Sequence, residues 1–337
     1  MNPFHLGAGR NLRRSLFSFC LLCVAAALLA NDPSQAQRAG NTRSAQAGQQ
    51  CPITNKEAVE GIRQQTFKNP STENLKQFLC TLPRFVNPIT GGTYYIVEGD
   101  IPLTEAEVRD YIHDPAGERG EDNSILAGAE LTVNLHLGKR DFYRNVSART
   151  LTYAVDRKSF DGDDAKFQAV RKNLRQAADE WQNLCDTCKI KFVDVTDPKV
   201  VPSPSNSINF VVRYENLNGA YIALAFFPHD PASERFLYID PSYFRNPFDP
   251  VGVMRHELGH VLGYRHEQIS DKEARQIPGC SGNEDGQWTM LTAYDPHSVM
   301  HYYCGTRGSL KLEFTPKDKI GHEDLYKLPS TTITPGN

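Results

Sequence analysis

The most constraining feature of this 337-residue chain is a histidine pattern in its C-terminal third. His256 and His260 are four residues apart, so on a helix their imidazoles lie on one face, about one turn apart, and can share a cation. Gly263 allows the chain to leave that helix with positive φ and to turn sharply. His266 then returns toward the same point. The spacing therefore predicts three imidazole ligands around one metal ion.

The chemistry of this ligand set favours a catalytic zinc ion, one per chain. Three neutral imidazoles leave the fourth tetrahedral position open, whereas structural zinc usually has four protein ligands. Glu257 follows the first histidine and is placed to take a proton from a water molecule at the open position. The alternative is a solvated helix with two unrelated histidines, and the third histidine and the glycine argue against it.

The N-terminus has the pattern of an export signal. Three arginines precede an uncharged stretch over residues 16–30, which suits a signal peptide and is shorter than the ~20 residues of a membrane span. Small side chains predict cleavage before Gln37 and hence a signal peptide over residues 1–36. Cleavage after Ala30 and an uncleaved anchor are the alternatives. We expect a secreted, periplasmic or extracellular protein with no stable membrane insertion after cleavage.

Cysteine usage agrees with an oxidising compartment. Removal of the signal peptide takes away Cys20 and Cys23, and the remaining even number of cysteines predicts structural disulfides. Sequence alone leaves the connectivity open, and pairing nearest neighbours is the simplest hypothesis: Cys51–Cys80, Cys185–Cys188 and Cys280–Cys304. The short spacing of the second pair also permits a thiol-disulfide oxidoreductase. Its helix lies before the motif rather than after it, which favours a structural disulfide.

Charge and composition exclude some functions. Lys and Arg number 37 against 40 Asp and Glu, so the chain lacks the basic excess of a dedicated nucleic-acid binder. Hydrophobic residues make up 39% of the chain, which is enough for a substantial core. We expect a protein or peptide partner and no nucleic acid.

The hydrophobic pattern predicts an α/β (α+β) domain in the second half of the chain. Apolar spacing predicts one long helix over residues 167–184, which packs behind a five-stranded mixed sheet. The strands are expected at residues 151–155, 189–195, 208–212, 220–227 and 235–239. Upstream, residues 93–97 read as a strand, and Thr104 with Glu107 predicts a capping box for a short helix.

Two segments of the sequence resemble the metzincins and, within them, the astacin family. Residues 256–268, HELGHVLGYRHEQ, are similar to the family's extended zinc signature, and residues 295–302, DPHSVMHY, to its Met-turn. The resemblance covers roughly residues 146–328. It implies a metzincin-like catalytic domain with an active-site helix, with Met300 supporting the metal site from below and Tyr302 as a catalytic residue that reaches the zinc. The residues after Gln268 depart from the animal astacins, which leaves another metzincin branch as an alternative.

A further resemblance lies upstream of this domain. Val97 to Asp100, VEGD, is similar to the astacin propeptide motif F-x-G-D, in which the aspartate occupies the zinc of the zymogen. The resemblance implies that Asp100 is a zymogen zinc ligand, and an ordinary Gly-Asp turn is the alternative. The expected division is a signal peptide over 1–36, a propeptide or N-terminal inhibitory region over 37–145, and the catalytic domain over 146–337.

The sequence thus predicts a secreted zinc-dependent endopeptidase that hydrolyses peptide bonds and is made as a zymogen. Lys139–Arg140 and Arg144 are possible activation sites, and the strand over 220–227 resembles the edge along which metzincin substrates extend. The alternative is a non-catalytic exported metal-binding module on the same fold. The presence of Glu257 argues against that alternative, because a module without activity has no use for the base.

Overall fold

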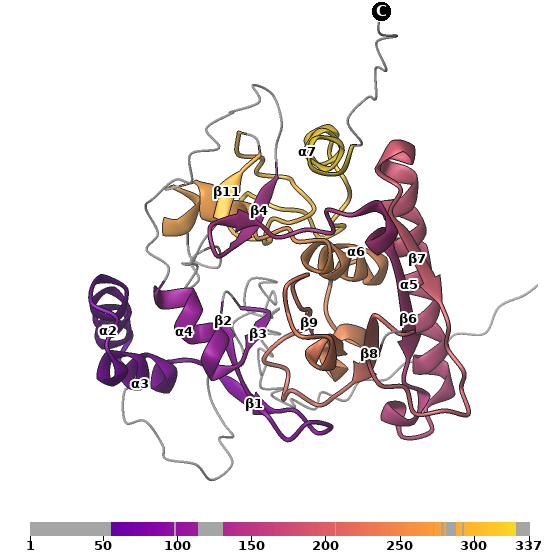
Figure 1. Cartoon of the computed structure of the whole chain (residues 1–337), viewed down its shortest axis with the longest axis horizontal. Helices are drawn as coiled ribbons and strands as arrows, with labels where there is room; N and C mark the ends of the chain where they lie inside the picture. The colour runs from indigo at the N-terminus through magenta and orange to yellow at the C-terminus, as the bar shows by residue number, and fades with distance from the viewer. Residues whose placement is uncertain are drawn as a thin grey trace, which may run out of the picture. The chain divides into compact units, whose positions relative to one another are not determined.

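The structure is a computed structural model, shown in Figure 1. It describes residues 55–97, 99–113, 131–205, 207–271, 273–277, 280, 288–291 and 293–327, all within one compact unit, Asp32–Asn337. The predicted signal peptide lies outside the described residues. Among the residues that are described, no helix combines the length and apolar character needed to cross a membrane.

A five-stranded mixed sheet forms the centre of the C-terminal half. Its strands follow the order β7-β6-β8-β10-β9. Their bounds are β6 Thr150–Val155, β7 Lys191–Asp194, β8 Phe210–Tyr214, β9 Ala223–Leu224 and β10 Phe236–Ile239. The first four strands in this order pair in parallel, and β9 pairs with β10 antiparallel at the edge. The mixed sheet predicted from the sequence is confirmed.

The edge strand is shorter than the apolar run over residues 220–227 predicts, because only Ala223 and Leu224 join the ladder. The N–H of Phe227 donates instead to the side chain of Asp230, at 2.9 Å. The chain therefore turns away from the sheet although its side chains remain buried.

Two helices pack on the sheet and on each other. α5, Asp164–Leu184, begins where Asp163 accepts a hydrogen bond from Lys166 N, and it lies along β6 and β7 in Figure 1. Its buried face is apolar and comprises Phe167, Val170, Leu174, Ala177, Ala178 and Trp181. α6, Pro250–Val261, lies against it, and Trp181 Nε1 donates to Arg255 O at 2.8 Å. α7, Pro316–Tyr326, completes the C-terminal part.

The N-terminal region, residues 55–113, has a small core of its own. It contains α2 Lys56–Lys68, α3 Thr72–Thr81, α4 Glu105–His113, and an antiparallel sheet of β1 Arg84–Val86, β2 Thr93–Val97 and β3 Ile101–Leu103. The capping box at the start of α4 is present: Thr104 N donates to Glu107 Oε2 at 2.6 Å, and Glu107 N donates to Thr104 Oγ1 at 3.3 Å. Phe227, from the C-terminal half, packs into this N-terminal core.

The segment over residues 131–145 belongs structurally with the C-terminal half. β4, Thr132–His136, pairs with β5, Lys139–Arg140, and with β11, Trp288–Met290. Leu131, Val133 and Tyr143 are part of the principal hydrophobic core. The predicted domain boundary at residue 145 remains a prediction, and the packing favours a boundary before Leu131.

Short 3₁₀ turns connect these elements: η2 Val146–Arg149, η3 Arg157–Phe160, η4 Asp186–Cys188, η5 Ala232–Glu234, η6 Pro241–Phe244, η7 Glu267–Ser270 and η8 Ala274–Gln276. The structure contains the disulfides Cys185–Cys188 and Cys280–Cys304. Cys80 is also disulfide-bonded, and Cys51 lies outside the described residues. Cys188 is fully buried, which is unsuited to the thiol-disulfide exchange considered above.

One buried arginine holds several of these segments together. Arg149 is 4% exposed and donates only to carbonyl oxygens. Its Nε reaches Tyr143 O at 2.9 Å, and its Nη1 reaches Cys188 O and Tyr326 O, each at 2.7 Å. The guanidinium therefore joins the chain before β6, the short disulfide loop and the end of α7.

We expect Arg149→Met to lower the free energy of unfolding by about 3 kcal/mol, because it leaves several buried carbonyl groups without donors. Urea denaturation of the two proteins measures this difference. Arg157→Met is the control, since Arg157 pairs with Asp164 while 49% exposed and should contribute under about 0.5 kcal/mol. Equal losses in the two variants would contradict this account of Arg149.

Candidate metal centre

Helix α6 carries three of the candidate residues and begins and packs for identifiable reasons. Asp249 caps it by accepting from Val251 N at 3.2 Å, and Pro250 occupies the first turn, where no N–H is needed. Gly259 lies against the Met-turn so closely that a Cβ at this position would overlap Met300 Sδ. The helix is buried along nearly its whole length, which places its two histidines in the interior.

The chain reverses after α6 as the sequence predicts. Gly263 has φ +100°, and a Cβ there would overlap Asp141 O. Two backbone hydrogen bonds then position the returning segment: Arg265 N donates to Thr132 O at 2.8 Å, and Glu267 N donates to Met300 O at 3.0 Å. His266 is held between these two anchors.

Four side chains converge on one point. His256, His260, His266 and Asp100 offer ligand atoms that all lie within 4.8 Å of one another, and all four residues are buried. The nearest contact is 3.0 Å, from His266 Nε2 to Asp100 Oδ2. His256 Nε2 lies 3.6 Å from Asp100 Oδ2, and His260 Nε2 lies 3.6 Å from Asp100 Oδ1. The N-terminal region thus inserts a carboxylate among the three imidazoles.

The imidazoles of the helix are oriented by carbonyl groups behind them. His256 Nδ1 lies 2.8 Å from Val299 O, and His260 Nδ1 lies 2.8 Å from Tyr264 O. Each Nδ1 therefore carries the proton, and each Nε2 presents its lone pair toward the shared point. Burial lowers the pKa of His266 to about 3, so this imidazole is neutral at neutral pH, which is the form that binds a metal.

This arrangement fits a zinc ion. Ligands at about 2.0 Å from a tetrahedral zinc lie about 3.3 Å from one another, close to the separations between Asp100 and the imidazoles. Among the described residues, His260 Nε2 and Asp100 Oδ1 are buried without a hydrogen-bond partner. A cation would satisfy both atoms, whereas without one each carries the cost of an unpaired buried polar group.

Glu257 lies beside this cluster but is not part of it. Its side chain is almost fully buried, and Oε2 accepts no hydrogen bond from any residue that the structure describes. Burial, and then the charge of Asp100, raise the pKa of Glu257 well above its ordinary value. A carboxylate with a raised pKa next to a metal site is suited to carry a proton.

Tyr302 reaches the cluster from the Met-turn. Its hydroxyl donates to Asp100 Oδ2 at 3.1 Å, and its ring centroid lies 4.2 Å from that of His266. Gly99 makes this contact possible, because its φ is +97° and a Cβ there would lie 2.6 Å from the Tyr302 hydroxyl. A larger residue in place of Gly99 would therefore clash with the Tyr302 hydroxyl and disrupt its hydrogen bond to Asp100.

The Met-turn is anchored by a residue that the sequence did not single out. Asp318, on α7, accepts from Ser298 Oγ at 2.6 Å and from Val299 N at 2.9 Å, and it also caps its own helix through Thr315 N at 2.8 Å. Because Val299 O in turn accepts from His256, Asp318 acts on the metal cluster through one backbone residue. The spacing of Thr315 and Asp318 is that of a capping box, which indicates the start of a helix but not the second contact with the Met-turn.

Glu267 also has a role that its position alone does not reveal. It is buried, and its two carboxylate oxygens accept from Asp295 N at 3.1 Å and from Thr132 Oγ1 at 3.2 Å. It thereby joins β4 to the segment that leads into the Met-turn. Its place directly after His266 was the signal that could have identified it.

Cys280, His301 and Cys304 form a second group with metal-ligand spacing. The two cysteines are joined in a disulfide, so their sulfurs are not available as thiolate ligands. His301 already has a partner at each nitrogen, Tyr302 O at Nδ1 and Tyr294 Oη at Nε2, each at 2.6 Å. This group is structural.

The site and the sequence define a class: the chain resembles the astacin-like zinc metallopeptidases of the metzincin clan. It is 29% identical over 112 residues to zinc metalloproteinase nas-3 of Caenorhabditis elegans, in a match that covers 31% of this chain and 38% of that protein. It is also 29% identical over 101 residues to zinc metalloproteinase nas-2 of the same organism, covering 28% of this chain and 34% of that protein. The matches thus span little more than a third of the relatives' length.

Two other comparisons complete the picture. No family model matches the sequence. Among solved structures, the structure of myroilysin aligns at 18% identity with a TM-score of 0.36, covering 59% of this chain and 99% of that one.

We expect the full chain to bind one zinc ion and His260→Ala to lose most of it, because the variant removes one of three imidazoles. Elemental analysis after dialysis, together with competition by a chromogenic chelator, measures the binding. His297→Ala is the matched control, since this histidine is exposed and lies outside the cluster. Unchanged zinc binding by His260→Ala would remove it from the ligand set.

Proposed function

We propose that the chain is an exported zinc-dependent endopeptidase that is made in a latent form. The convergence of His256, His260 and His266 beside a buried Glu257 is the observation that carries the proposal. The resemblance to zinc metalloproteinases supports the same class of reaction. Export is supported by the predicted signal peptide and by the disulfides in the structure.

A bound zinc would polarise the scissile carbonyl and lower the pKa of the attacking water. Glu257 accepts the proton of that water and passes it to the leaving amine, which its position beside the ligands and its raised pKa both suit. Tyr302 donates its phenolic hydrogen to the carbonyl oxygen of the substrate as negative charge develops there. The hydroxyl already donates to the Asp100 carboxylate in this structure, so its hydrogen-bonding direction is the one required.

The edge of the main sheet is where we expect a peptide substrate to lie. β9 pairs only with β10 among the described strands, so its other side offers backbone groups for strand addition. Phe227, three residues after β9, contacts the ring of His260 edge-on, with the centroids 5.8 Å apart. A peptide extended along β9 would thus run toward the metal centre.

Latency would arise from Asp100. Its carboxylate lies 3.0 Å from His266 Nε2, at the point that we assign to the attacking water, and it accepts a hydrogen bond from the Tyr302 hydroxyl. Asp100 would thereby block the position of the attacking water and also occupy the Tyr302 hydroxyl that donates to the oxyanion. Activation would then require the N-terminal region to leave the metal centre.

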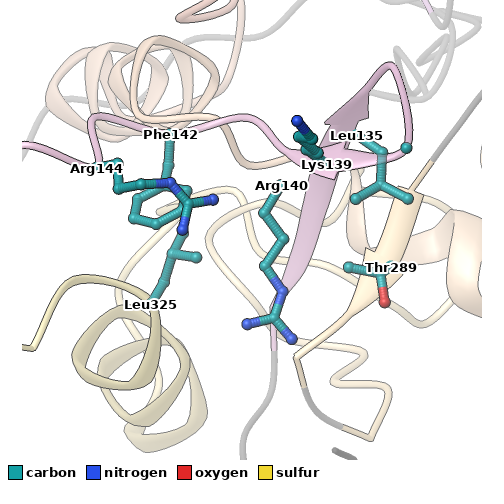
Figure 2. A pocket seen from close by; sticks show the side chains of 8 residues that line it. Leu135, Lys139, Arg140, Phe142, Arg144, Thr289 and Leu325 are labelled. Carbon is teal, nitrogen blue, oxygen red and sulfur yellow. The ribbon is translucent and has the colours of Figure 1, made fainter. Parts of the chain in front are cut away.

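The packing of β4 and β5 argues that activation cleaves before Leu131. Figure 2 shows the Arg140 side chain extending from β5 between Thr289 and Leu325. These three side chains line a cavity of about 270 Å³, and Lys139 and Arg144 line it as well. Cleavage at these basic residues would leave β4 on the released N-terminal fragment. However, β4 pairs with β11 and contributes Val133 to the principal core, so we expect it to stay with the peptidase.

In the activated protein, Glu257→Gln should retain zinc and lose about 10²- to 10⁴-fold in kcat, because the amide cannot accept the proton. Hydrolysis of a casein or quenched-peptide mixture, with zinc analysis of the same samples, tests this. Glu273→Gln is the control, with its side chain 87% exposed on a nearby loop. Near-parent turnover by Glu257→Gln would refute the mechanism.

In the uncut chain, Asp100→Ala should raise peptide hydrolysis by about tenfold or more, because the substitution removes a metal ligand and a charge-assisted hydrogen bond. Mass spectrometry of each sample shows that the chain is still intact at the time of the assay. Asp110→Ala, on the exposed side of α4, should stay latent. If the intact parent is fully active, Asp100 does not inhibit.

A further inference from the structure

The main sheet has a second buried face, opposite the one that packs against α5. Side chains alternate along a strand, so successive residues of β8 and β10 point to opposite sides of the sheet. Phe210, Val212 and Leu237 belong to the principal core, together with the apolar side of α5. The residues between them belong to a separate apolar cluster, which we call the outer face: Val211, Leu217, Leu224, Phe236 and Tyr238. None of the five is more than 7% exposed.

The cover over the outer face comes from the N-terminal region. Ile96 of β2 is 3% exposed and belongs to the same cluster, and Phe85 of β1 packs against it. The rings of Phe85 and Tyr238 meet edge-on, with their centroids 5.2 Å apart. Two strands of the N-terminal region therefore form a second layer on the main sheet.

β2 lies between two apolar layers. Val97 belongs to the core that α3 and α4 form, and Tyr95 packs against that core. Ile96, between them, points the other way and packs on the outer face, as the period of a strand requires. Asp100 follows three residues after the end of β2. The strand that leads to the metal centre is thus itself held against the main sheet.

The apolar contact is reciprocal. Phe227, from the C-terminal half, is 5% exposed and packs in the N-terminal core with Val108 and Ile112 of α4. Each part of the chain therefore completes an apolar cluster of the other. If the two parts separated, both would expose large apolar side chains in one place, which soluble monomers rarely do.

These contacts require neither a continuous chain nor a metal ion. Residues 114–130 lie between α4 and β4, where we propose that activation cleaves. A cut there leaves Phe85, Ile96 and Phe227 in their places, and hydrophobic stabilisation depends on the apolar area kept from water. What cleavage removes is the high effective concentration of one part near the other, on the order of mM for a short linker.

We propose that the outer face is a docking surface for residues 55–113 that outlasts activation cleavage. After the cut, the N-terminal region stays bound as a separate polypeptide and keeps the metal centre closed. Activity appears only when that polypeptide dissociates or is itself degraded. The inference rests on the proposed peptidase and its latency, and it adds a second step to activation.

Co-elution of the two fragments tests the docking without relying on catalysis. The recognition sequence of a site-specific protease is inserted into full-length Glu257→Gln between Asn123 and Ser124, and in a second protein between Gly117 and Glu118. Mass spectrometry confirms the cut. At about 1 μM, gel filtration should return both fragments in one peak, because we expect a Kd below this concentration. Separate peaks from the zinc-loaded protein would overturn the proposal.

Removal of the metal distinguishes the outer face from the contact at Asp100. The cut protein is treated with a chelator, and its zinc content is measured. The fragments should still co-elute, because the apolar contacts need no metal. Asp100→Ala should retain its N-terminal fragment for the same reason. If the fragments separate in both cases, the metal centre alone holds the region and the outer face is not a docking surface.

Two neighbouring residues of β1 assign the retention to the outer face. Phe85→Ala removes the ring that meets Tyr238 and should speed dissociation of the cut protein about tenfold. Val86→Ala is the matched control, since Val86 is 62% exposed on the same strand and should change the rate by under about twofold. Exchange between labelled and unlabelled cut protein gives the rates. Equal rates would contradict the assignment, and Ile96→Ala replaces Phe85→Ala if that variant does not fold.

Peptide hydrolysis by the cut protein with Glu257 intact shows whether the retained fragment inhibits. Hydrolysis per molecule should be low at about 1 μM and rise severalfold on dilution to about 1 nM, as the fragment dissociates. Full activity at about 1 μM, with mass spectrometry showing the fragment intact, would overturn the inference. Failure of the proposed function looks different: no peptide would be cut after complete removal of the fragment, although the two fragments had co-eluted.

Discussion

The rest of the structure depends on the meeting of three imidazoles and one carboxylate in the protein interior. Buried polar atoms that lack partners are costly, and His260 Nε2 and Asp100 Oδ1 have none among the described residues. A cation at their shared point would remove that cost, and the imidazoles of His256 and His266 are placed to bind the same ion. Gly259 of α6 lets Met300 approach the helix closely, and this packing holds the two helical histidines in place.

Behind the ligands lies a set of hydrogen bonds that ties distant segments to the metal centre. Val299 links His256 to Asp318 on α7, and Glu267 links the residue after the third histidine to Thr132 of β4 and to Asp295. Such outer partners set the orientation of the imidazoles and therefore the affinity for the metal. They also tie β4 to the C-terminal half of the chain.

The N-terminal region meets the C-terminal half through two chemically different kinds of contact. In the first, the Asp100 carboxylate lies among three imidazoles, 3.0 Å from His266 Nε2. In the second, Phe227 packs among the apolar side chains of α3, α4 and the N-terminal strands. The first contact is polar and the second is apolar, so both charge and hydrophobic burial hold the region in place.

The sequence by itself determined what depends on neighbours along the chain. The i, i+4 spacing of His256 and His260, the turn at Gly263 and the capping box at Thr104 are local, because helix periodicity and backbone geometry act over a few residues. The five strands followed from apolar runs, apart from the early end of β9, which a side-chain hydrogen bond of Asp230 decided. Only the tertiary structure brought Asp100 to His266 across 166 residues and packed Phe227 among the side chains of the N-terminal core, because such contacts depend on how whole segments pack. No pattern within a single segment encodes them.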